Sequence, residues 1–315
     1  MSPIFFVHIP KTAGTSFRKA AEQFFSSERV FYDYSPTEKE TSSLVCQWIY
    51  KERDFLSFYQ ELCNKNASFL SGHVNASKYV YLFGACQTVT FVRDPVQRIV
   101  SEYQHFVRHH GYEGDLPSFY RKPQFINRQS KILQGVPLEA IGFLGLNEAY
   151  EDSLAILNQR YNFDIQSIDM NMGRTDKTTN YELPKEQLEE LNYLNQQDIR
   201  LYRMAVRLFE QRRALFNEGK SYVHGAIHQL SDKSTSGWAW HAKNDSPVKV
   251  SVLINGKKIA TLSSKDLRPA FLRLGLPRSG YVGFHYNFEA PLIKGSVVEV
   301  VVPETGQLLG KRRVQ

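Results

Sequence analysis

The chain has 315 residues, of which 42% are apolar and 23% charged; this composition is typical of a folded globular protein and excludes a disordered or collagen-like chain. No apolar run approaches the roughly 18 residues that a membrane-spanning helix needs, and the N-terminus lacks the basic and apolar regions of a signal peptide. The net charge of +7 is uneven: of 39 basic and 32 acidic residues, 13 and 6 lie in 221–315, which leaves 26 of each in 1–220.

The first two thirds of the chain alternate between strand-like and helix-like patterns. The apolar run 4–9 predicts a buried parallel strand, and a helical pattern follows over 16–25. Residues 88–92 predict a second buried strand. In the helix that follows, Asp94 suits the N-cap and Pro95 the first position, and the apolar face is expected to comprise Val96, Ile99, Val100, Tyr103, Phe106 and Val107. Further helices are expected at about 148–161 and 184–217.

From about residue 221 the pattern changes to β-strands. Asn255-Gly256 separates two strand-like runs and is a strong hairpin signal. Residues 281–288 and 296–302 predict two more strands. We therefore expect an all-β sandwich of roughly 90 residues, with a domain boundary near Gly219 that separates residues 1–219 from residues 220–315.

The turn after the first strand, residues 8–16, has the sequence His-Ile-Pro-Lys-Thr-Ala-Gly-Thr-Ser. Backbone N–H groups of such a turn and of the helix N-terminus can surround an oxyanion; Gly14 permits close approach and Lys11 adds a positive charge. The triphosphatase order G-x-x-x-x-G-K-[ST] is absent, because Lys11 precedes Gly14. The turn is interpreted as an anion-binding cradle; the alternative is an ordinary turn capped by Thr or Ser.

The second buried strand ends at Arg93, at the edge where open α/β sheets bind ligands. Ser101 lies about two turns into the following helix, off its apolar face. An arginine and a hydroxyl in these positions could hold a second phosphate. The alternative is a surface Arg–Asp pair and a solvated serine.

The two junctions together resemble the cofactor signatures of the sulfotransferases that use 3′-phosphoadenosine 5′-phosphosulfate (PAPS). Residues 8–16 resemble the loop around the 5′-phosphosulfate, and R-D-P-x-x-R-x-x-S-x-Y at 93–103 resembles the 3′-phosphate site. The chain is most similar to the branch containing heparan sulfate 2-O-sulfotransferases and their bacterial relatives, with agreement also over 68–74, 127–135, 142–157, 171–185 and 195–202. The resemblance covers about residues 3–215 and implies an α/β fold: a P-loop-like parallel sheet flanked by helices, followed here by the small β-sandwich.

The resemblance also implies residue roles. Lys11 would stabilise the bridging oxygen as the bisphosphate leaves, and Arg93 and Ser101 would hold the 3′-phosphate. Arg174 would close over the PAPS co-substrate. The residues expected around the 5′-phosphosulfate are Lys11, Thr12, Ala13, Gly14, Thr15 and Ser16. No metal is expected, because Lys and backbone donors can supply the positioning and charge stabilisation that group transfer needs.

The general base implied by the resemblance is His73, whose ordinary pKa of about 6.5 suits proton removal near neutrality. The alternative is a structural histidine after a Ser-Gly turn. Ser71 stands where some 2-O-sulfotransferases carry a second histidine, which leaves the sulfated position open. Glu102 is a poor base candidate beside a phosphate site. His105 and His109 share one helix face but lack a third ligand, which favours a solvated face over a metal site.

The sequence therefore predicts a PAPS-dependent O-sulfotransferase that acts on a carbohydrate or glycolipid hydroxyl. The basic tail resembles β-sandwich modules appended to bacterial glycosyltransferases and sulfotransferases; it favours an anionic acceptor, or is simply a mildly basic surface. No nucleic-acid partner is expected, because no base-reading module is present. Animal Golgi enzymes of this branch carry a membrane anchor that this sequence lacks, so we expect a bacterial, cytoplasmic enzyme. The alternatives are a P-loop kinase-like enzyme and a non-catalytic glycan-binding protein on the same fold.

The three cysteines, Cys46, Cys63 and Cys86, agree with a cytoplasmic protein. They are odd in number and lack a close metal-ligand spacing. We expect reduced, buried thiols at these positions rather than a disulfide framework.

Overall fold

The computed structural model describes residues 2–168 and 181–315. The chain forms two compact units. Unit 1 comprises Met1–Phe83, Gln87–Leu138 and Phe143–Phe209, and unit 2 comprises Gly84–Cys86, Glu139–Gly142 and Glu210–Gln315.

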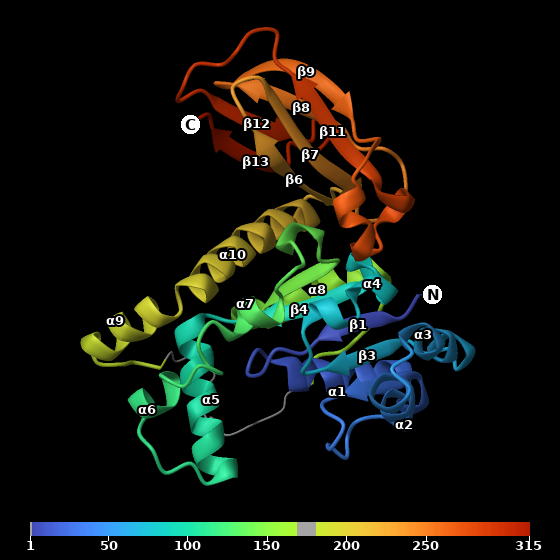
Figure 1. Ribbon diagram of the computed structural model, residues 1–315, viewed down its shortest axis with the longest axis vertical. Coiled ribbons are helices and arrows are strands. Elements are labelled where there is room, and N and C mark those ends of the chain that lie inside the picture. Colours follow the sequence, from blue (N-terminus) through green and yellow to red (C-terminus); the bar gives the residue numbers. More distant parts are fainter. Residues whose placement is uncertain (1, 169–180) are drawn as a thin grey trace. The chain divides into compact units, whose positions relative to one another are not determined.

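Unit 1 contains a five-stranded parallel sheet with the strand order β2-β3-β1-β4-β5, flanked by helices (Figure 1). The strands are β1 Ile4–Val7, β2 Val30–Asp33, β3 Phe69–Gly72, β4 Thr88–Val92 and β5 Phe143–Leu146. The helices are α1 Gly14–Phe25, α2 Ser43–Val45 with the π-helical Cys46–Lys51, α3 Phe55–Asn64, α4 Val80–Phe83, α5 Pro95–His110, α6 Leu116–Tyr120, α7 Arg128–Ile132, α8 Tyr150–Tyr161, α9 Lys185–Leu194 and α10 Gln196–Asn217, which ends in unit 2. The predicted α/β class is confirmed.

The middle of this sheet explains the two apolar runs in the sequence. All residues of β1 and β4 are buried, as is usual for inner strands of a parallel sheet that is covered on both faces. Phe17 of α1 packs edge-on against Phe6 of β1, with ring centroids 4.8 Å apart. Because β3, β1 and β4 are adjacent and parallel, the segments that follow them all leave the sheet at one edge.

The helix predicted over 184–217 is two helices, α9 and α10, with a break at Asn195. The Asn195 side chain donates to the Leu191 carbonyl (3.0 Å) and accepts from the Asn127 N–H (2.8 Å). Asn127 Oδ1 in turn accepts from the N–H groups of Gln197 and Asp198, 3.0 and 3.1 Å away. These bonds to a distant loop end one helix and begin the next, which helical periodicity alone does not reveal.

Two further expectations about burial are corrected. The α5 face was expected to be apolar throughout, but Val107 is 42% exposed, whereas Arg98 and Glu102 are fully buried as an ion pair. The cysteines are free thiols, but none is buried: Cys63 is exposed and the other two are half-buried. Cys63 faces outward because α3 turns Phe58 and Leu62 inward.

Unit 2 is built on two four-stranded antiparallel sheets, with the orders β10-β11-β7-β6 and β13-β12-β8-β9. The strands are β6 Val223–Leu230, β7 Ser234–His241, β8 Lys249–Ile254, β9 Lys257–Ser263, β10 Asp266–Leu267, β11 Tyr281–Asn287, β12 Val297–Val301 and β13 Leu308–Arg313. Apolar side chains from both sheets form one core. The predicted hairpin is present between β8 and β9, with Asn255 and Gly256 at φ 48° and 82°.

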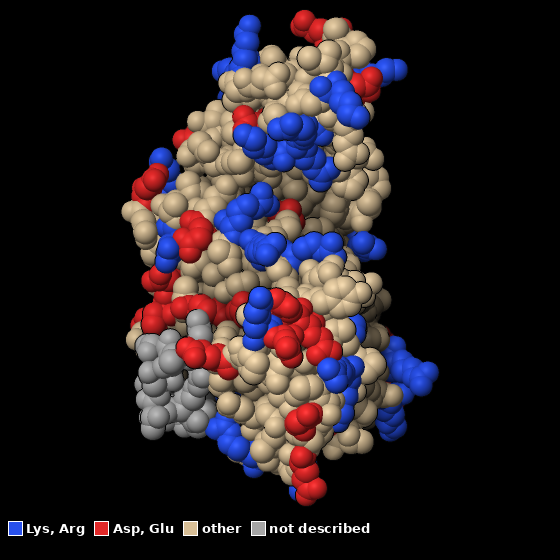
Figure 2. Space-filling model, turned by 90° about the vertical axis from the view of Figure 1, so that its left-hand side faces the viewer, with Lys and Arg blue, Asp and Glu red and all other residues tan. Residues whose placement is uncertain are grey.

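The surface of unit 2 is rich in basic side chains, as the uneven charge of the sequence predicts. On the face drawn in Figure 2, blue Lys and Arg side chains gather over unit 2, the upper part of the picture. Among the described residues, no helix combines the length and the apolar character that crossing a membrane requires.

Candidate functional site

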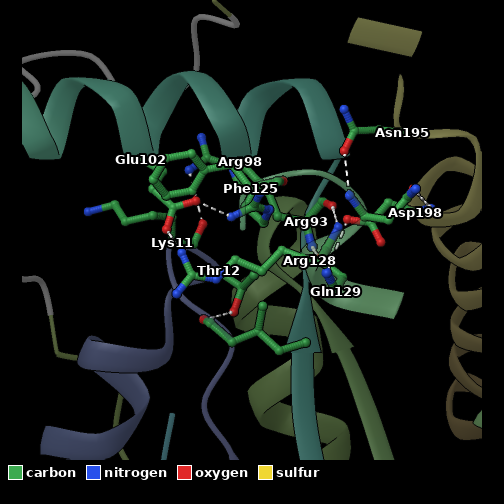
Figure 3. A network of polar contacts seen from close by, with 12 residues as sticks. Lys11, Thr12, Arg93, Arg98, Glu102, Phe125, Arg128, Gln129, Asn195 and Asp198 are labelled. Carbon is green, nitrogen blue, oxygen red and sulfur yellow. Dashed lines mark hydrogen bonds and ion pairs between the residues drawn. The ribbon is translucent and has the colours of Figure 1, made fainter. Parts of the chain in front are cut away.

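The turn after β1 has an alternating backbone conformation that suits an anion. Lys11 (φ 68°) and Ala13 (φ 64°) are left-handed although neither is glycine, and they flank Thr12, which is not left-handed. Alternation of this kind directs successive backbone N–H groups into one concavity. The Thr12 hydroxyl donates to the Ile9 carbonyl (2.9 Å) and fixes the turn from within (Figure 3).

The N-terminus of α1 adds uncapped donors to this turn. The first intrahelical bond runs from the Phe17 N–H to the Ala13 carbonyl (3.1 Å), so the N–H groups of residues 14–16 have no intrahelical acceptor. The N-cap residue Ala13 supplies no side-chain cap, so the alternative of a turn capped by Thr or Ser is not the geometry found. A Cβ on Gly14 would lie 2.1 Å from Cδ2 of His8, and only glycine fits there.

Arg93 joins the β4–α5 junction to this turn. Its Nη1 donates to the Lys11 carbonyl (3.3 Å). The Gln129 side chain holds the Arg93 backbone on both sides, accepting from its N–H (3.0 Å) and donating to its carbonyl (2.8 Å). Asp94 caps α5 through the Gln97 N–H (3.0 Å), as predicted. Figure 3 shows Arg93 among Lys11, Gln129 and Arg128.

A buried ion cluster lies beside the turn. Glu102, 1% exposed, accepts from Arg98 Nη1 (2.6 Å) and from Arg128 Nη1. Arg98 also donates to the Phe125 carbonyl (3.3 Å). Glu102 is thus held between two guanidinium groups, which agrees with its exclusion as a base. The three side chains carry one net positive charge, which favours an anion nearby (Figure 3).

The charge environment of Lys11 also favours an anion. Burial, followed by the positive charges of Arg108 and Arg93, lowers the pKa of Lys11, and Glu102 opposes the shift. The desolvation and the two cations outweigh the single carboxylate of Glu102, so a polyanionic ligand beside Lys11 would stabilise its ammonium form.

Helices α7 and α10 cap each other at their N-termini and so fix the segment that holds Arg93. The Asp198 carboxylate of α10 accepts from the N–H groups of Gln129 and Ser130, at 3.1 and 2.7 Å. In return Asn127, just before α7, accepts from the first amides of α10. Figure 3 shows Asp198 and Asn195 at the right-hand side of the polar network.

His73 follows β3 directly and lies next to the turn. The His8 N–H donates to the Gly72 carbonyl (3.0 Å), and the His73 ring contacts the rings of His8 and Tyr34 at centroid distances of 4.5 and 4.7 Å. His73 as a whole is exposed to solvent. Desolvation by the surrounding protein, with the charges of Arg128 and Arg18, lowers the pKa of His73 to about 4. Its ring is therefore neutral at physiological pH and can accept a proton.

A buried carboxylate supports the segment that carries His73. Asp33, 0% exposed at the end of β2, accepts from Tyr50 Oη (2.6 Å), Lys78 Nζ (2.6 Å) and Tyr79 Oη (2.7 Å). A Cβ on Gly72 would lie 2.2 Å from the Asp33 carbonyl oxygen. Both ends of the His73 segment are thus tied to β2.

The remaining predicted site residues form no described hydrogen bond or ion pair with the turn, Arg93 or His73. Ser101 is half-buried on α5, and its side chain forms no hydrogen bond within the described part of the chain. Arg174 lies outside the described residues. His105 and His109 stack at 4.8 Å, and over 2–168 and 181–315 no group of three or more His, Cys, Asp or Glu could hold a metal.

Several residues of the site were not identified from the sequence, above all His8, Tyr34 and Asp33. His8 lies at the end of the first buried strand, where a titratable residue in an apolar run could have indicated a functional site. No local pattern connects it with Tyr34, 26 residues away, or indicates that Asp33 would be buried.

Comparison with known proteins finds a family similarity over part of the chain. Residues 2–135 match the model described as the sulfotransferase family. A crystal structure of a sulfotransferase from Alicyclobacillus acidocaldarius aligns with 70% of this chain and 98% of its own, at 14% identity and a TM-score of 0.36, too low to establish a common fold. Among curated proteins, none matches the sequence significantly. The matched residues include the turn, His73, Arg93 and Ser101, and they support sulfuryl transfer in general.

Proposed function

We propose that this protein is a PAPS-dependent O-sulfotransferase. The observation that carries the proposal is the convergence of three segments at adjacent strand ends: the turn 8–16 after β1, His73 after β3 and Arg93 after β4. Open α/β sheets bind ligands at such an edge. The family match over residues 2–135 contains all three segments.

The donor site fits the chemistry of PAPS, which brings three anionic groups. The alternating turn and the uncapped N-terminus of α1 offer backbone N–H groups to the 5′-phosphosulfate. Lys11 and the Arg98–Glu102–Arg128 cluster add positive charge beside them. By resemblance, Arg93 and Ser101 would take the 3′-phosphate, and Arg174 would close over the donor.

The transfer we propose is an in-line displacement at sulfur. The acceptor oxygen forms a bond to sulfur while the bond from sulfur to the bridging phosphate oxygen breaks, and that oxygen leaves with the electron pair. His73, neutral at physiological pH, takes the hydroxyl proton. Lys11 stabilises the negative charge on the leaving 3′-phosphoadenosine 5′-phosphate.

The acceptor we propose is a carbohydrate or glycolipid hydroxyl, as in the heparan sulfate 2-O-sulfotransferase-like branch. We assign the chemistry to residues 1–219 and an accessory role to residues 220–315. The basic surface of unit 2 supports an anionic acceptor (Figure 2). A bacterial, cytoplasmic setting belongs to the same proposal.

The donor assignment is tested by thermal unfolding with nucleotides. 3′-Phosphoadenosine 5′-phosphate should raise the melting temperature through binding to the native state. Adenosine 5′-phosphate, which lacks the 3′-phosphate, should raise it far less. Ser101→Ala should narrow this difference, whereas Ser118→Ala, on the neighbouring α6, should not. Equal shifts for the two nucleotides would contradict the role of Arg93 and Ser101.

The reaction itself is tested with labelled PAPS and a panel of glycans. Label should move to a glycan without added metal. Transfer of phosphate from ATP in place of sulfate would favour the kinase-like alternative. Glycan binding without transfer from either donor would favour the non-catalytic one.

A further inference from the structure

His8 is a buried polar group of the site, and the proposed reaction gives it no role. It is 5% exposed, and its ring lies between those of Phe6 and His73, with centroids 5.5 and 4.5 Å away. Its one side-chain hydrogen bond within the described residues joins Nδ1 to the Tyr34 hydroxyl (3.0 Å). Nε2 therefore has no partner there.

The unpartnered edge of the ring is directed at the cradle. A Cβ built on Gly14 would lie 2.1 Å from Cδ2 and 2.4 Å from Nε2 of His8. Gly14 is the first residue of α1, whose first N–H groups are uncapped. Nε2 thus lies beside the backbone donors of the helix N-terminus.

The direction of the bond to Tyr34 settles which nitrogen carries the proton. The Tyr34 hydroxyl has one proton, and it meets His8 Nδ1 (3.0 Å) and the side chains of Ser71 and Arg18. The contact with Ser71 acts to lower the pKa of Tyr34, so Ser71 donates to the phenol oxygen, and its hydroxyl has no other partner in the described structure. The guanidinium of Arg18, 5.4 Å from the Tyr34 ring centroid, has only donors and cannot accept that proton. Burial raises the pKa of Tyr34, so the phenol remains protonated. Tyr34 accordingly donates to Nδ1, and a neutral His8 carries its proton on Nε2.

Burial and the neighbouring groups keep His8 neutral. The groups that face it are His73 after β3, Arg18 on α1, Lys11 in the turn and Tyr34 after β2. Burial, then His73, Arg18 and Lys11, lower the pKa of His8 well below its ordinary value. A neutral Nε2–H among backbone N–H groups is a donor and not a base.

We propose that His8 is an anion-binding residue of the cradle, whose Nε2–H donates to an oxyanion held by residues 11–16, and that Tyr34 positions it by fixing this tautomer. The anion class is a sulfate or phosphate oxygen. Only the assignment of that oxygen to the phosphosulfate of PAPS rests on the proposed function.

The first test is the tautomer in the free protein, read from the ring ¹⁵N shifts of ¹⁵N-histidine-labelled protein. We expect His8 with Nε2 protonated and Nδ1 as acceptor. Tyr34→Phe should remove this preference, whereas Tyr32→Phe should not. Tyr32 is a matched control, because its ring also contacts Arg18 and Tyr34 but its hydroxyl does not bond to His8, whose partner is Tyr34. A proton on Nδ1 in the wild type overturns the proposal.

The second test is anion affinity, measured by calorimetry with inorganic pyrophosphate and with 3′-phosphoadenosine 5′-phosphate. His8→Leu should weaken both by about 10-fold, since one hydrogen bond to a charged group is lost. His8→Gln, which keeps a side-chain N–H, should recover part of that loss, and Tyr34→Phe should weaken binding less than His8→Leu. Melting temperatures check that each variant is folded.

The outcomes separate this proposal from the proposed function. Unchanged anion affinity in folded His8→Leu overturns the role of His8 and leaves sulfuryl transfer standing. Tight, His8-dependent binding of pyrophosphate without sulfuryl transfer supports His8 and contradicts the proposed function. Absence of any anion binding in the wild type overturns both.

Discussion

Several single residues of this site have an unfavourable backbone conformation or a buried polar side chain. Lys11 and Ala13 have left-handed backbones without being glycine, which costs about 1–2 kcal/mol per residue. His8 and Glu102 are polar groups with almost no exposure. Such features persist where the surrounding structure holds them, and they cluster at functional sites. Here they place donors and positive charge around one turn.

His73→Ala should lower turnover by roughly 10²- to 10⁴-fold, the usual contribution of a general base. The affinity for 3′-phosphoadenosine 5′-phosphate should change little, because no donor-binding role is assigned to His73. His109→Ala is the control: His109 is an exposed histidine on α5. Steady-state kinetics and calorimetry measure both effects. Wild-type turnover in His73→Ala would identify His73 as structural.

The activity should depend on pH through this single residue, His73. Only the neutral ring accepts a proton, so activity should fall as the pH drops through the His73 pKa of about 4. Its NMR titration in the free protein should therefore lie well below 6.5, the ordinary value for histidine. A bound anion should raise it, because negative charge favours the imidazolium. A free-protein midpoint near 6.5 would refute the environment described for His73.

At the scale of elements, the site depends on strand order and on helices that cap one another. Adjacent parallel strands β3, β1 and β4 place three distant segments at one edge. The α7–α10 pair then holds Gln129, which fixes the backbone of Arg93. Stability of that pair is thus linked to the geometry of the donor site.

Asp198→Ala should destabilise unit 1 by about 2–3 kcal/mol, because a buried cap is lost and two amides are left without an acceptor. Affinity for 3′-phosphoadenosine 5′-phosphate should also fall, as Gln129 loosens its hold on Arg93. Glu186→Ala, an exposed acidic residue on α9, is the control and should change neither quantity. Urea unfolding and calorimetry provide the measurements. Normal affinity in a destabilised Asp198→Ala would show that the cap does not support the donor site.

At the scale of the whole molecule, the chain does not divide into two units at a single point. Unit 2 includes Gly84–Cys86 and Glu139–Gly142 from the first half of the sequence. The Glu139 carbonyl bonds to His224 Nδ1 (2.9 Å), and a Cβ on Gly84 would lie 2.8 Å from the Gly275 carbonyl oxygen. A chain that ended at the proposed boundary, residue 219, would therefore lack the partners of these two segments.

A chain truncated after Gly219 should keep its affinity for 3′-phosphoadenosine 5′-phosphate, because every described residue of the proposed donor site lies in unit 1. Its melting temperature should fall by about 5 °C or more, since 84–86 and 139–142 lose their partners. It should also lose affinity for a large acidic glycan, mainly at low salt, where surface charge is least screened. Calorimetry at two salt concentrations measures this loss. If the intact and truncated chains bind the glycan equally, unit 2 is not a charged anchor.

Local patterns were sufficient for much of the fold. The buried strands β1 and β4, the Asp94-Pro95 helix start and the Asn255-Gly256 hairpin all follow from residues close in sequence, because periodicity, capping and turn chemistry are short-range effects. The turn after β1 was predicted for the same reason, and its role in anion binding stays a prediction. Its residue roles, beyond the local geometry, stay predictions.

Tertiary structure decided what depends on long-range contacts. The burial of Arg98 and Glu102 required Arg128 and the Phe125 carbonyl, and the break at Asn195 required Asn127. The contact of His8 with Tyr34 and His73 depends on the strand order β2-β3-β1. A helical or strand period assigns each residue to a face, but the neighbour on that face is chosen by packing. For this protein, the sequence by itself determined where an anion could be held, and the packing determined which side chains surround it.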